Sequence, residues 1–468
     1  MPVFLQSISL AAKDRSGNRR QKERWFFSSF LCIWRAGKPV VCSSFYCPEG
    51  RGVFSFFGIN PEGHPDPRPI ILHENWPGNV YPLRKDFDWQ YRPPKARASY
   101  PFQRVEGEGV YEIPVGPVHA GIIEPGHFRF SVVGEEIVSL EARLGYTHKG
   151  IEKLFEVLPF EKKVMLSERV SGDSSFSHSL AYCQAVEKLG DAEVPKKALY
   201  LRVIYAELER IANHLGDIGA IMMDTAFAFG GSNGARLREI VMQWNEKLTG
   251  SRFLRGVNTV GGVTKDIPSE IKQDFKASLA ALEKDFKEVI EIAEGTATLM
   301  NRLHGTGSID RTVALDHGIL GVAGKAVGIA QDTRIDFPYA AYKEMPLRMA
   351  LESSGDVYAR FKVRISEVLN SIEIIRHALR TMPNGDICTL SLPRLKKQSF
   401  AFSLVEGWRG DIAYFVATDE QGTITRCKVR DTSFLNWAIM GYAVTNDVVP
   451  DFPLINKSFN LSYSGNDL

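Results

Sequence analysis

The chain has 468 residues and a mass of 52.3 kDa, which at about 150 residues per domain suggests two to four domains. Its 44% hydrophobic and 24% charged residues are ordinary for a globular protein and exclude a disordered, collagen-like or disulfide-scaffold protein. The net charge of +2 creates no strong field for nucleic acid or an anionic membrane. No apolar run is long enough to span a bilayer, and six Cys without a C-x-x-C pair are typical of an intracellular protein.

The first 95 residues carry little regular periodicity. In residues 1–56 no helical or strand period continues for more than a few residues, and we interpret them as an irregular or degenerate segment. Residues 57–95 are rich in glycine and proline, the residues typical of turns, as in Gly63–Arg68. Because proline fixes φ and removes an amide donor, this composition disfavours a helix or a central strand. These residues predict an extended strap. Residues 96–468 are expected to form one larger domain.

The elements that follow predict an α+β fold. Residues 110–145 alternate as a β-hairpin with a first strand from Tyr111 to His119. Apolar residues spaced by three and four predict long helices over 199–227, after Asp266, and over about 357–380. Short strands and turns are expected in the tail. We therefore predict a mainly helical bundle core with a small N-terminal β region and a mixed C-terminal tail, residues 400–468.

Polar residues form a stripe on the helix expected over 199–227. Glu207, Arg210, His214 and Asp217 are spaced to lie on one face. This face is either solvated or a buried polar track. Asp224 favours a buried track, because its neighbours are too apolar to lie in water and a buried carboxylate needs a partner or a function.

Two other motifs are weak. The serine-rich segment Ser167–His178 could hold a Ser/His nucleophile pair, but no strand–turn–helix elbow surrounds it, so a hydrolase is disfavoured. The glycines of the segment 318–328 do not have the G-x-G-x-x-G spacing, so nucleotide binding is disfavoured as well.

Residues 110–468 resemble the large subunit of energy-converting (group 4) nickel–iron hydrogenases and the related quinone-pocket protein of complex I, its D-type subunit. Residues 57–87 resemble the C-terminal signature of the C-type subunit of complex I, which some of these hydrogenases carry in front. The matching segments of the larger region are Val115–Gly121, Glu124–Phe130, Gly145–Lys153, Glu207–Leu215 and Gly355–Arg360.

The sequence departs from this family at its metal ligands. The family binds nickel and iron through two C-x-x-C pairs, since soft thiolates hold these metals. The resemblance places Ser171 and Ser174 at the first pair and Ser462 and Gly465 at the second. A serine hydroxyl is neither soft nor deprotonated near neutral pH. We therefore expect no nickel–iron centre and no metal ligand in this chain.

The resemblance also implies where chemistry could occur. Complex I grips its quinone with a His in the hairpin turn and a Tyr, where this chain has Glu124–Pro125 and Gly172. Glu124 instead matches a hydrogenase glutamate implicated in proton transfer. We predict Glu124, His127 and Asp224 as catalytic residues.

Four further residues are predicted to couple protons and electrons near a partner's iron–sulfur cluster: Arg169, His178, Arg210 and His214. Two alternatives stay open. His178 could instead satisfy a buried backbone group, and Arg210 and Asp356 could be structural ion-pair members.

The resemblance implies an oxidoreductase subunit on the cytoplasmic side of the cell membrane, peripherally bound. It would form a proton-coupled electron-acceptor cavity with an iron–sulfur small subunit similar to the B-type subunit of complex I, which would hold a 4Fe–4S cluster. A quinone is one candidate acceptor, and this chain would bind no cofactor directly. Antiporter-like membrane proteins and a membrane protein similar to the H-type subunit of complex I are the other expected partners, with no nucleic acid. The alternative is a catalytically silent structural or coupling subunit of the same kind of complex.

Overall fold

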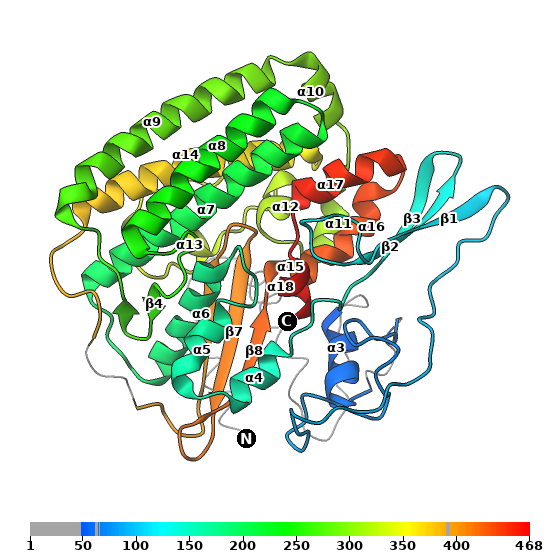
Figure 1. The fold of residues 1–468 in the computed structure, drawn as a ribbon, viewed down its shortest axis with the longest axis horizontal. Helices are drawn as coiled ribbons and strands as arrows, with labels where there is room; N and C mark the ends of the chain where they lie inside the picture. Colours follow the sequence, from blue (N-terminus) through cyan, green and yellow to red (C-terminus); the bar gives the residue numbers. More distant parts are fainter. Residues whose placement is uncertain (1–47, 61–63, 65, 390–393) are drawn as a thin grey trace.

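The computed structural model describes residues 48–60, 64, 66–389 and 394–468. A bundle of four long helices forms one side of the molecule, at the upper left of Figure 1: α7 Lys196–Asp224, α8 Ala228–Thr249, α9 Ser269–Glu294 and α14 Val357–Thr381. Helices α7, α9 and α14 confirm the three predicted from periodicity. In α9 the predicted apolar residues are buried in the common core: Phe275, Leu279, Leu282, Phe286 and Ile290.

Helix α8 was not predicted, because its first two turns contain three glycines that disfavour a helix. Those glycines serve the packing of α8 on α7. A Cβ on Gly234 would lie 2.5 Å from the Cα of Gly219 on α7, so the two backbones meet where neither residue has a side chain. Tertiary packing therefore overrides local propensity in this helix.

An antiparallel sheet follows the N-terminal strap, with strand order β1 Val110–Val115, β2 His127–Val133 and β3 Glu136–Arg143. The hairpin prediction is confirmed, but its first strand ends at Val115 rather than at His119. Gly116 has a φ of +89°, and a Cβ there would lie 2.2 Å from the carbonyl oxygen of Gly126. The chain thus leaves the sheet at Gly116 and forms the loop 116–126.

The tail forms a second antiparallel sheet, β6 Phe400–Glu406, β7 Asp411–Thr418 and β8 Ile424–Arg430, against which α6 Ser175–Leu189 packs. The predicted strands are confirmed, but the expected turns after residue 430 are wrong. Segments of five to eight residues fold there as helices too short to display a helical period: α15 Thr432–Asn436, α16 Met440–Val444, α17 Phe452–Phe459 and α18 Tyr463–Asp467.

Shorter elements connect these layers. They are α4 Ile151–Val157, α5 Phe160–Ser167, α10 Ala297–Leu303, α11 Arg311–Asp316, α12 Gly321–Ala326 and α13 Thr333–Asp336, with the ribbon β4 Asn258–Thr259 and β5 Gly262–Val263. Single 3-10 turns lie at η1 Tyr342–Glu344, η2 Trp437–Ile439 and η3 Val449–Asp451.

The N-terminal segment contains helix α3, Pro48–Phe57, which corrects the prediction that residues 1–56 lack a regular element; residues 1–47 lie outside the described part. The described residues of 58–95 form turns and extended chain without a helix or strand, and Phe57, the first residue of the predicted strap, belongs to α3. Arg143 at the end of β3 anchors this strap by donating to the carbonyl oxygens of Ile70 (2.7 Å) and Leu72 (2.8 Å).

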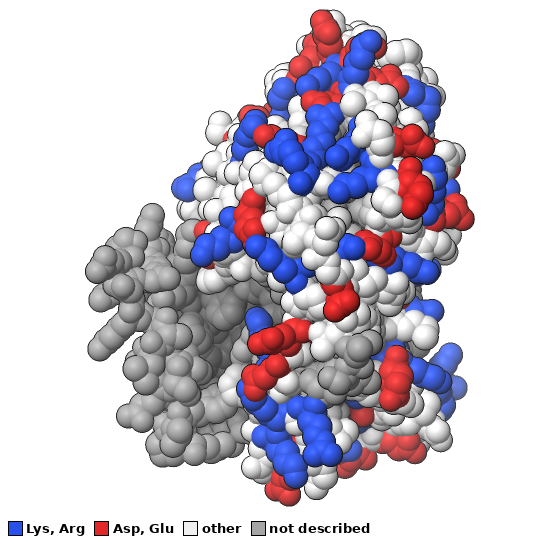
Figure 2. All heavy atoms as spheres, turned by 90° about the vertical axis from the view of Figure 1, so that its left-hand side faces the viewer, with Lys and Arg blue, Asp and Glu red and all other residues white. Residues whose placement is uncertain are grey.

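The surface carries charges of both signs. On the face in Figure 2, basic side chains gather in the upper part, and acidic side chains lie around and between them. Among the described helices, none combines the length and apolarity needed to cross a membrane.

Candidate functional site

The structure brings together the positions that the resemblance aligned with metal ligands. The hydroxyl oxygens of Ser171 and Ser462 lie 2.9 Å apart although 291 residues separate them. Ser171 precedes α6, and Ser174 is the N-cap of the same helix. Ser462 is the N-cap of α18, where its hydroxyl accepts from the amide of Gly465 at 2.9 Å. We call these four residues the serine cluster.

The serine cluster does not fit a nickel–iron centre. Hydroxyls replace three of the thiolates, and the fourth position lacks room for a side chain. A Cβ on Gly465 would lie 2.7 Å from the carboxyl carbon of Asp431. Within the described ranges, no three His, Cys, Asp or Glu side chains are grouped in a way that could hold a metal ion.

An ion pair lies against the serine cluster. Arg409, just before β7, donates to the two carboxylate oxygens of Asp173 at 2.7 and 2.6 Å, and Ser171 donates to the same carboxylate at 2.8 Å. Burial works to raise the pKa of Asp173, but the Arg409 guanidinium outweighs it and lowers this pKa below its usual value. Asp173 is therefore an anion fixed in position by a bidentate partner.

Glu124 lies beside the serine cluster, as expected from the resemblance. It is half-buried in the loop 116–126, and its carboxylate accepts from the amide of Ser464 at 2.9 Å. The neighbouring His119 contacts the hydroxyl of Tyr463 with its Nε2 at 3.2 Å. A carboxylate and an imidazole thus approach the cluster from the loop, and sequence reasoning assigned no role to His119.

His127 begins strand β2 and makes different contacts. Its ring packs on Phe102 with centroids 5.4 Å apart, and its Nδ1 lies 3.5 Å from the carbonyl oxygen of Gly116. Burial lowers the pKa of His127, so its neutral form is favoured. Its polar contacts do not include the serine cluster.

The burial predicted for Asp224 is wrong. Asp224 is exposed at the last turn of α7, between an exposed Met223 and an exposed Phe229. Partial burial raises the pKa of its carboxyl, with Lys457 acting in the opposite direction. The apolar neighbours misled the prediction, because apolar side chains at the ends of helices often stay on the surface.

Arg169 and His178 differ in their burial. Arg169 is exposed and donates to the carbonyl oxygen of Met165 at 2.7 Å. His178 is fully buried, and its two ring nitrogens contact Asp431 (3.0 Å) and the hydroxyl of Tyr414 (3.1 Å). These side-chain partners correct the alternative that His178 satisfies a backbone group.

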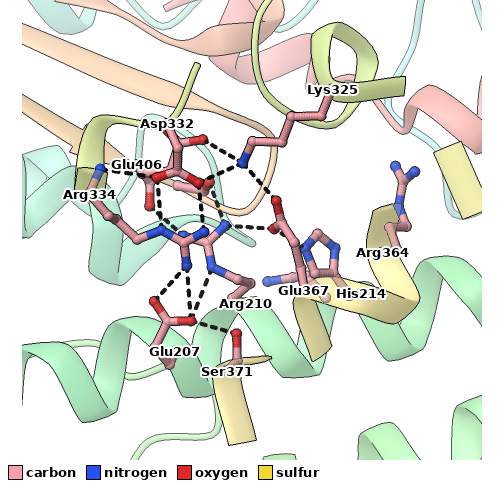
Figure 3. Close-up of polar contacts among 12 residues, drawn as sticks. Glu207, Arg210, His214, Lys325, Asp332, Arg334, Arg364, Glu367, Ser371 and Glu406 are labelled. Atoms are coloured by element: carbon pink, nitrogen blue, oxygen red, sulfur yellow. Dashed lines mark hydrogen bonds and ion pairs between the residues drawn. The ribbon is translucent and has the colours of Figure 1, made fainter. Parts of the chain in front are cut away.

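The polar stripe on α7 is a buried track and not a solvated face. Glu207, Arg210 and His214 belong to a cluster of charged side chains enclosed by α7, α12, α13, α14 and β6 (Figure 3), whereas Asp217, also buried, pairs with Arg364 of α14 at 2.9 Å. We call this the buried ionic cluster: Glu207, Arg210, His214, Lys325, Asp332, Arg334, Glu367 and Glu406.

Each cation in the buried ionic cluster contacts more than one carboxylate. The Lys325 ammonium lies 2.7 Å from Asp332, 2.7 Å from Glu367 and 3.3 Å from Glu406. Arg210 contacts Glu207 at 3.2 Å and Glu367 at 3.1 Å. Such sharing keeps several buried charges paired, which a buried charge requires.

The remaining contacts complete the cluster. Arg334 joins Asp332 (2.7 Å) to Glu207 (3.1 Å), and His214 contacts Glu367 with its Nε2 at 2.8 Å. Burial lowers the pKa of His214. For Glu367, burial acts to raise the pKa, but Lys325 and Arg210 lower it far below its usual range.

Arg210 and Asp356, the two residues that could instead be structural ion-pair members, have different kinds of partner. Arg210 is an ion-pair member, as that alternative expected. Asp356 is instead the N-cap of α14, where its carboxylate accepts from the amide of Ala359 at 2.8 Å and from the Gly305 amide at 2.9 Å; among the described residues it has no ion-pair partner.

Sequence reasoning missed Asp173, Arg409, Lys325, Glu367 and Glu406. A usable signal existed for Lys325, which is the only charged residue in the apolar stretch 318–330. An isolated charge in such a stretch indicates a buried ion pair. No comparable signal marked Arg409, since its partner lies 236 residues away.

The family described as respiratory-chain NADH dehydrogenase, 49 kDa subunit, matches residues 217–400 and 396–467. The family described as the 30 kDa subunit of the same enzyme matches residues 49–93. Formate hydrogenlyase subunit 5 of Escherichia coli strain K12 is 33% identical over 422 residues, covering 89% of this chain and 74% of that protein.

Other similar proteins come from related complexes. The NADH-quinone oxidoreductase C/D subunit of Phocaeicola vulgatus is 31% identical over 447 residues, covering 91% of this chain and 83% of the relative. A chain in the structure of an archaeal respiratory membrane complex, the membrane-bound sulfane sulfur reductase, matches with a TM-score of 0.73 and 27% identity, covering 77% of this chain and 99% of that one. The chain belongs to the 49 kDa subunit family of respiratory-chain NADH dehydrogenase, whose relatives are subunits of complex I-like and hydrogenase membrane complexes.

Proposed function

We propose that this chain is a peripheral subunit of a membrane-associated oxidoreductase and forms an electron-acceptor cavity at the serine cluster, without nickel and iron. The observation that carries this proposal is the replacement of thiolates by Ser171, Ser174 and Ser462, with Glu124 still beside them. The cavity keeps a proton-carrying group and lacks ligands for a metal.

The electrons would come from a partner. Among the described residues no group of Cys, His, Asp or Glu side chains could hold a metal ion, so a small subunit similar to the B-type subunit of complex I would hold a 4Fe–4S cluster next to the cavity. The exposed Arg169 and the exposed Gly172 lie beside Ser171, where such a partner could approach. Antiporter-like membrane proteins and a protein similar to the H-type subunit of complex I would complete the assembly on the cytoplasmic side of the membrane.

The acceptor would be a small molecule that takes electrons together with protons. The names of the relatives include a quinone reductase and a sulfane sulfur reductase, so a quinone and a sulfane sulfur compound are the two candidates. Glu124 would supply protons, because its hydrogen bond from Ser464 holds the carboxylate at the cluster.

The alternative is a catalytically silent subunit that holds the complex together or couples it to ion transport. The Arg409–Asp173 ion pair and the Ser171–Ser462 hydrogen bond favour it, since these contacts satisfy the polar groups of the cluster without a ligand. Substitution of Glu124 separates the two functions.

The test compares Glu124→Gln with Glu135→Gln in the purified complex. Glu135 is an exposed carboxylate in the β2–β3 turn and serves as the matched control. With a short-chain quinone or polysulfide as acceptor, Glu124→Gln should lower turnover by on the order of 10²-fold or more, with all subunits still present. Unchanged turnover would favour the silent subunit.

Two further measurements bear on the same proposal. Metal analysis of the purified complex should find no nickel, and about one nickel per chain would contradict the proposed cavity. Purification through a tag on this chain should recover an iron–sulfur small subunit and antiporter-like membrane proteins.

A further inference from the structure

The charges of the buried ionic cluster do not balance. It holds three permanent cations and four carboxyl groups. All of them are almost inaccessible to solvent, so water cannot compensate a surplus charge. The cations are Arg210, Lys325 and Arg334, and the carboxyl groups are those of Glu207, Asp332, Glu367 and Glu406.

His214 does not supply the missing positive charge. Its Nε2 lies 2.8 Å from Glu367, but its buried Nδ1 has no hydrogen-bond partner in the described structure. An imidazolium would place an N–H on both nitrogens, and an unpartnered buried donor is costly. The geometry therefore fits a neutral His214 that donates from Nε2. One carboxyl group must then carry a proton for the cluster to be neutral.

The hydrogen bonds indicate which carboxyl group this is. Glu367 accepts from Lys325, Arg210 and His214. Glu207 accepts from Arg210, Arg334, Tyr342 and Ser371. Asp332 accepts from both Lys325 and Arg334. Each of these three carboxylates is thus stabilised as an anion by two cations. By contrast, the Glu406 carboxyl group contacts a single cation within the described ranges, the Lys325 ammonium at 3.3 Å, and accepts from the Thr333 amide at 3.0 Å.

We propose that Glu406 is a proton-binding site that holds one exchangeable proton for the buried ionic cluster. Burial, followed by the negative charge of Asp332, raises the pKa of Glu406 to about 7. The proton is therefore bound below about pH 7 and released above it. Titratable and charged groups surround Glu406 from every packed element. Helix α7 contributes Glu207, Arg210 and His214, and α14 contributes Glu367. The others are Lys325 of α12, Asp332 and Arg334 at α13, Tyr339, Tyr342, and the Asp411–Arg430 ion pair of β7 and β8.

The proton-binding site is joined to the serine cluster by the turn between β6 and β7. Glu406 belongs to the buried ionic cluster, and Arg409, three residues later, pairs with Asp173. Between them, the Trp408 indole donates to the carbonyl oxygen of Asp173 at 3.1 Å and meets the His214 ring edge to face, with centroids 6.1 Å apart. If the proposed function holds, negative charge that enters the cavity raises the affinity of Glu406 for its proton.

The test measures protonated carboxyl groups in the full-length chain at rest, without donor or acceptor. Infrared difference spectra between pH 6 and pH 8 report the carbonyl stretch of a carboxylic acid, and isotopic labelling of glutamate identifies its source. Glu406→Gln should remove one such band that titrates near pH 7. A spectrum in which Glu406→Gln leaves every titrating band unchanged would overturn the proposal.

Two kinds of variant make the test specific. Burial also raises the pKa of Glu209 to about 7, and this residue lies outside the buried ionic cluster, where it accepts from the amides of Phe176 and Ser177. Glu209→Gln should remove its own band and leave that of Glu406.

Variants that change the charge balance provide the second part of the test. Glu367→Gln or Asp332→Asn deletes one negative charge, so Glu406 should ionise and its band at pH 7 should vanish although Glu406 is intact.

The outcomes separate this inference from the proposed function. A band that persists at pH 7 in both charge-balance variants would show that the surplus charge does not set the protonation of Glu406, and would overturn the inference. None of these spectra depends on turnover. If the unsubstituted chain shows no Glu406 band although the complex turns over normally, the inference fails and the cavity proposal stands. If the expected bands appear in an inactive complex, the inference stands and the cavity proposal fails.

Discussion

At the scale of single residues, Lys325 shows how a long side chain can organise a buried polar region. Its ammonium contacts carboxylates from three different parts of the chain: Asp332, Glu367 and Glu406. Burial acts to lower the pKa of Lys325, but Asp332 and Glu367 outweigh it and raise this pKa above its usual value. The ammonium therefore stays charged, and the carboxylates depend on it.

Lys325→Met should lower the free energy of unfolding by about 3–5 kcal/mol, because it leaves buried carboxylates without their shared cation. Chemical denaturation measures the change. Lys287→Met is the matched control, since Lys287 is largely exposed and pairs with Glu283 on the surface of α9, and such a pair contributes about 0–1 kcal/mol. Equal stability of the two variants would contradict the role assigned to Lys325.

At the scale of elements, the contact between α7 and α8 depends on two glycines. The backbones of Gly219 and Gly234 approach so closely that a Cβ on Gly234 would lie 2.9 Å from the Gly219 nitrogen. Helix α7 carries Glu207, Arg210 and His214 of the buried ionic cluster, so a shift of α7 would move these groups.

Gly234→Ala should destabilise the protein by about 1–3 kcal/mol, because overpacking at the backbone outweighs the gain in helix propensity of about 1 kcal/mol. Thermal unfolding provides the measurement. Gly216→Ala is the control on the same face of α7: its Cβ would meet the flexible side chain of Arg238 at 3.0 Å, and the variant should be neutral or slightly more stable. A stabilised Gly234→Ala would be inconsistent with a close helix contact.

At the scale of the whole molecule, the N-terminal strap is held to the larger domain by side chains of the first sheet. Arg143 is buried and donates to carbonyl oxygens of the strap, and the Arg68 guanidinium of the strap pairs with Glu141 on the same strand. A strap without regular hydrogen bonds of its own depends on such contacts.

Arg143→Met should free the strap, because the carbonyl oxygens of Ile70 and Leu72 lose their donor. Limited proteolysis should then cut within residues 66–95 at least several times faster, with the remaining chain resistant. Arg129→Met is the control, since Arg129 on β2 pairs with Glu112 of the same sheet and stacks on Phe102, which follows the strap. Equal cleavage of both variants would argue against Arg143 as the anchor.

The sequence alone was sufficient for features with a local signal. Apolar residues at helical spacing predicted α7, α9 and α14, because each helix buries one continuous face. The proline-rich sequence of residues 57–95 predicted an extended strap. The resemblance aligned Ser171 and Ser462 with metal ligands from two different pairs, and the structure places their hydroxyls in contact. Glu124 was likewise predicted at that place.

Only the tertiary structure decided features that join distant segments. The spacing of Glu207, Arg210 and His214 fitted a solvated face as well as a buried one, and burial under α14 and β6 resolves the choice. The same holds for Asp224, whose exposure depends on where α7 ends. Lys325 and Glu406 are 81 residues apart, and no local pattern relates them. Periodicity reports which face of an element is apolar, whereas the charge balance of a buried cluster exists only after its elements have packed together.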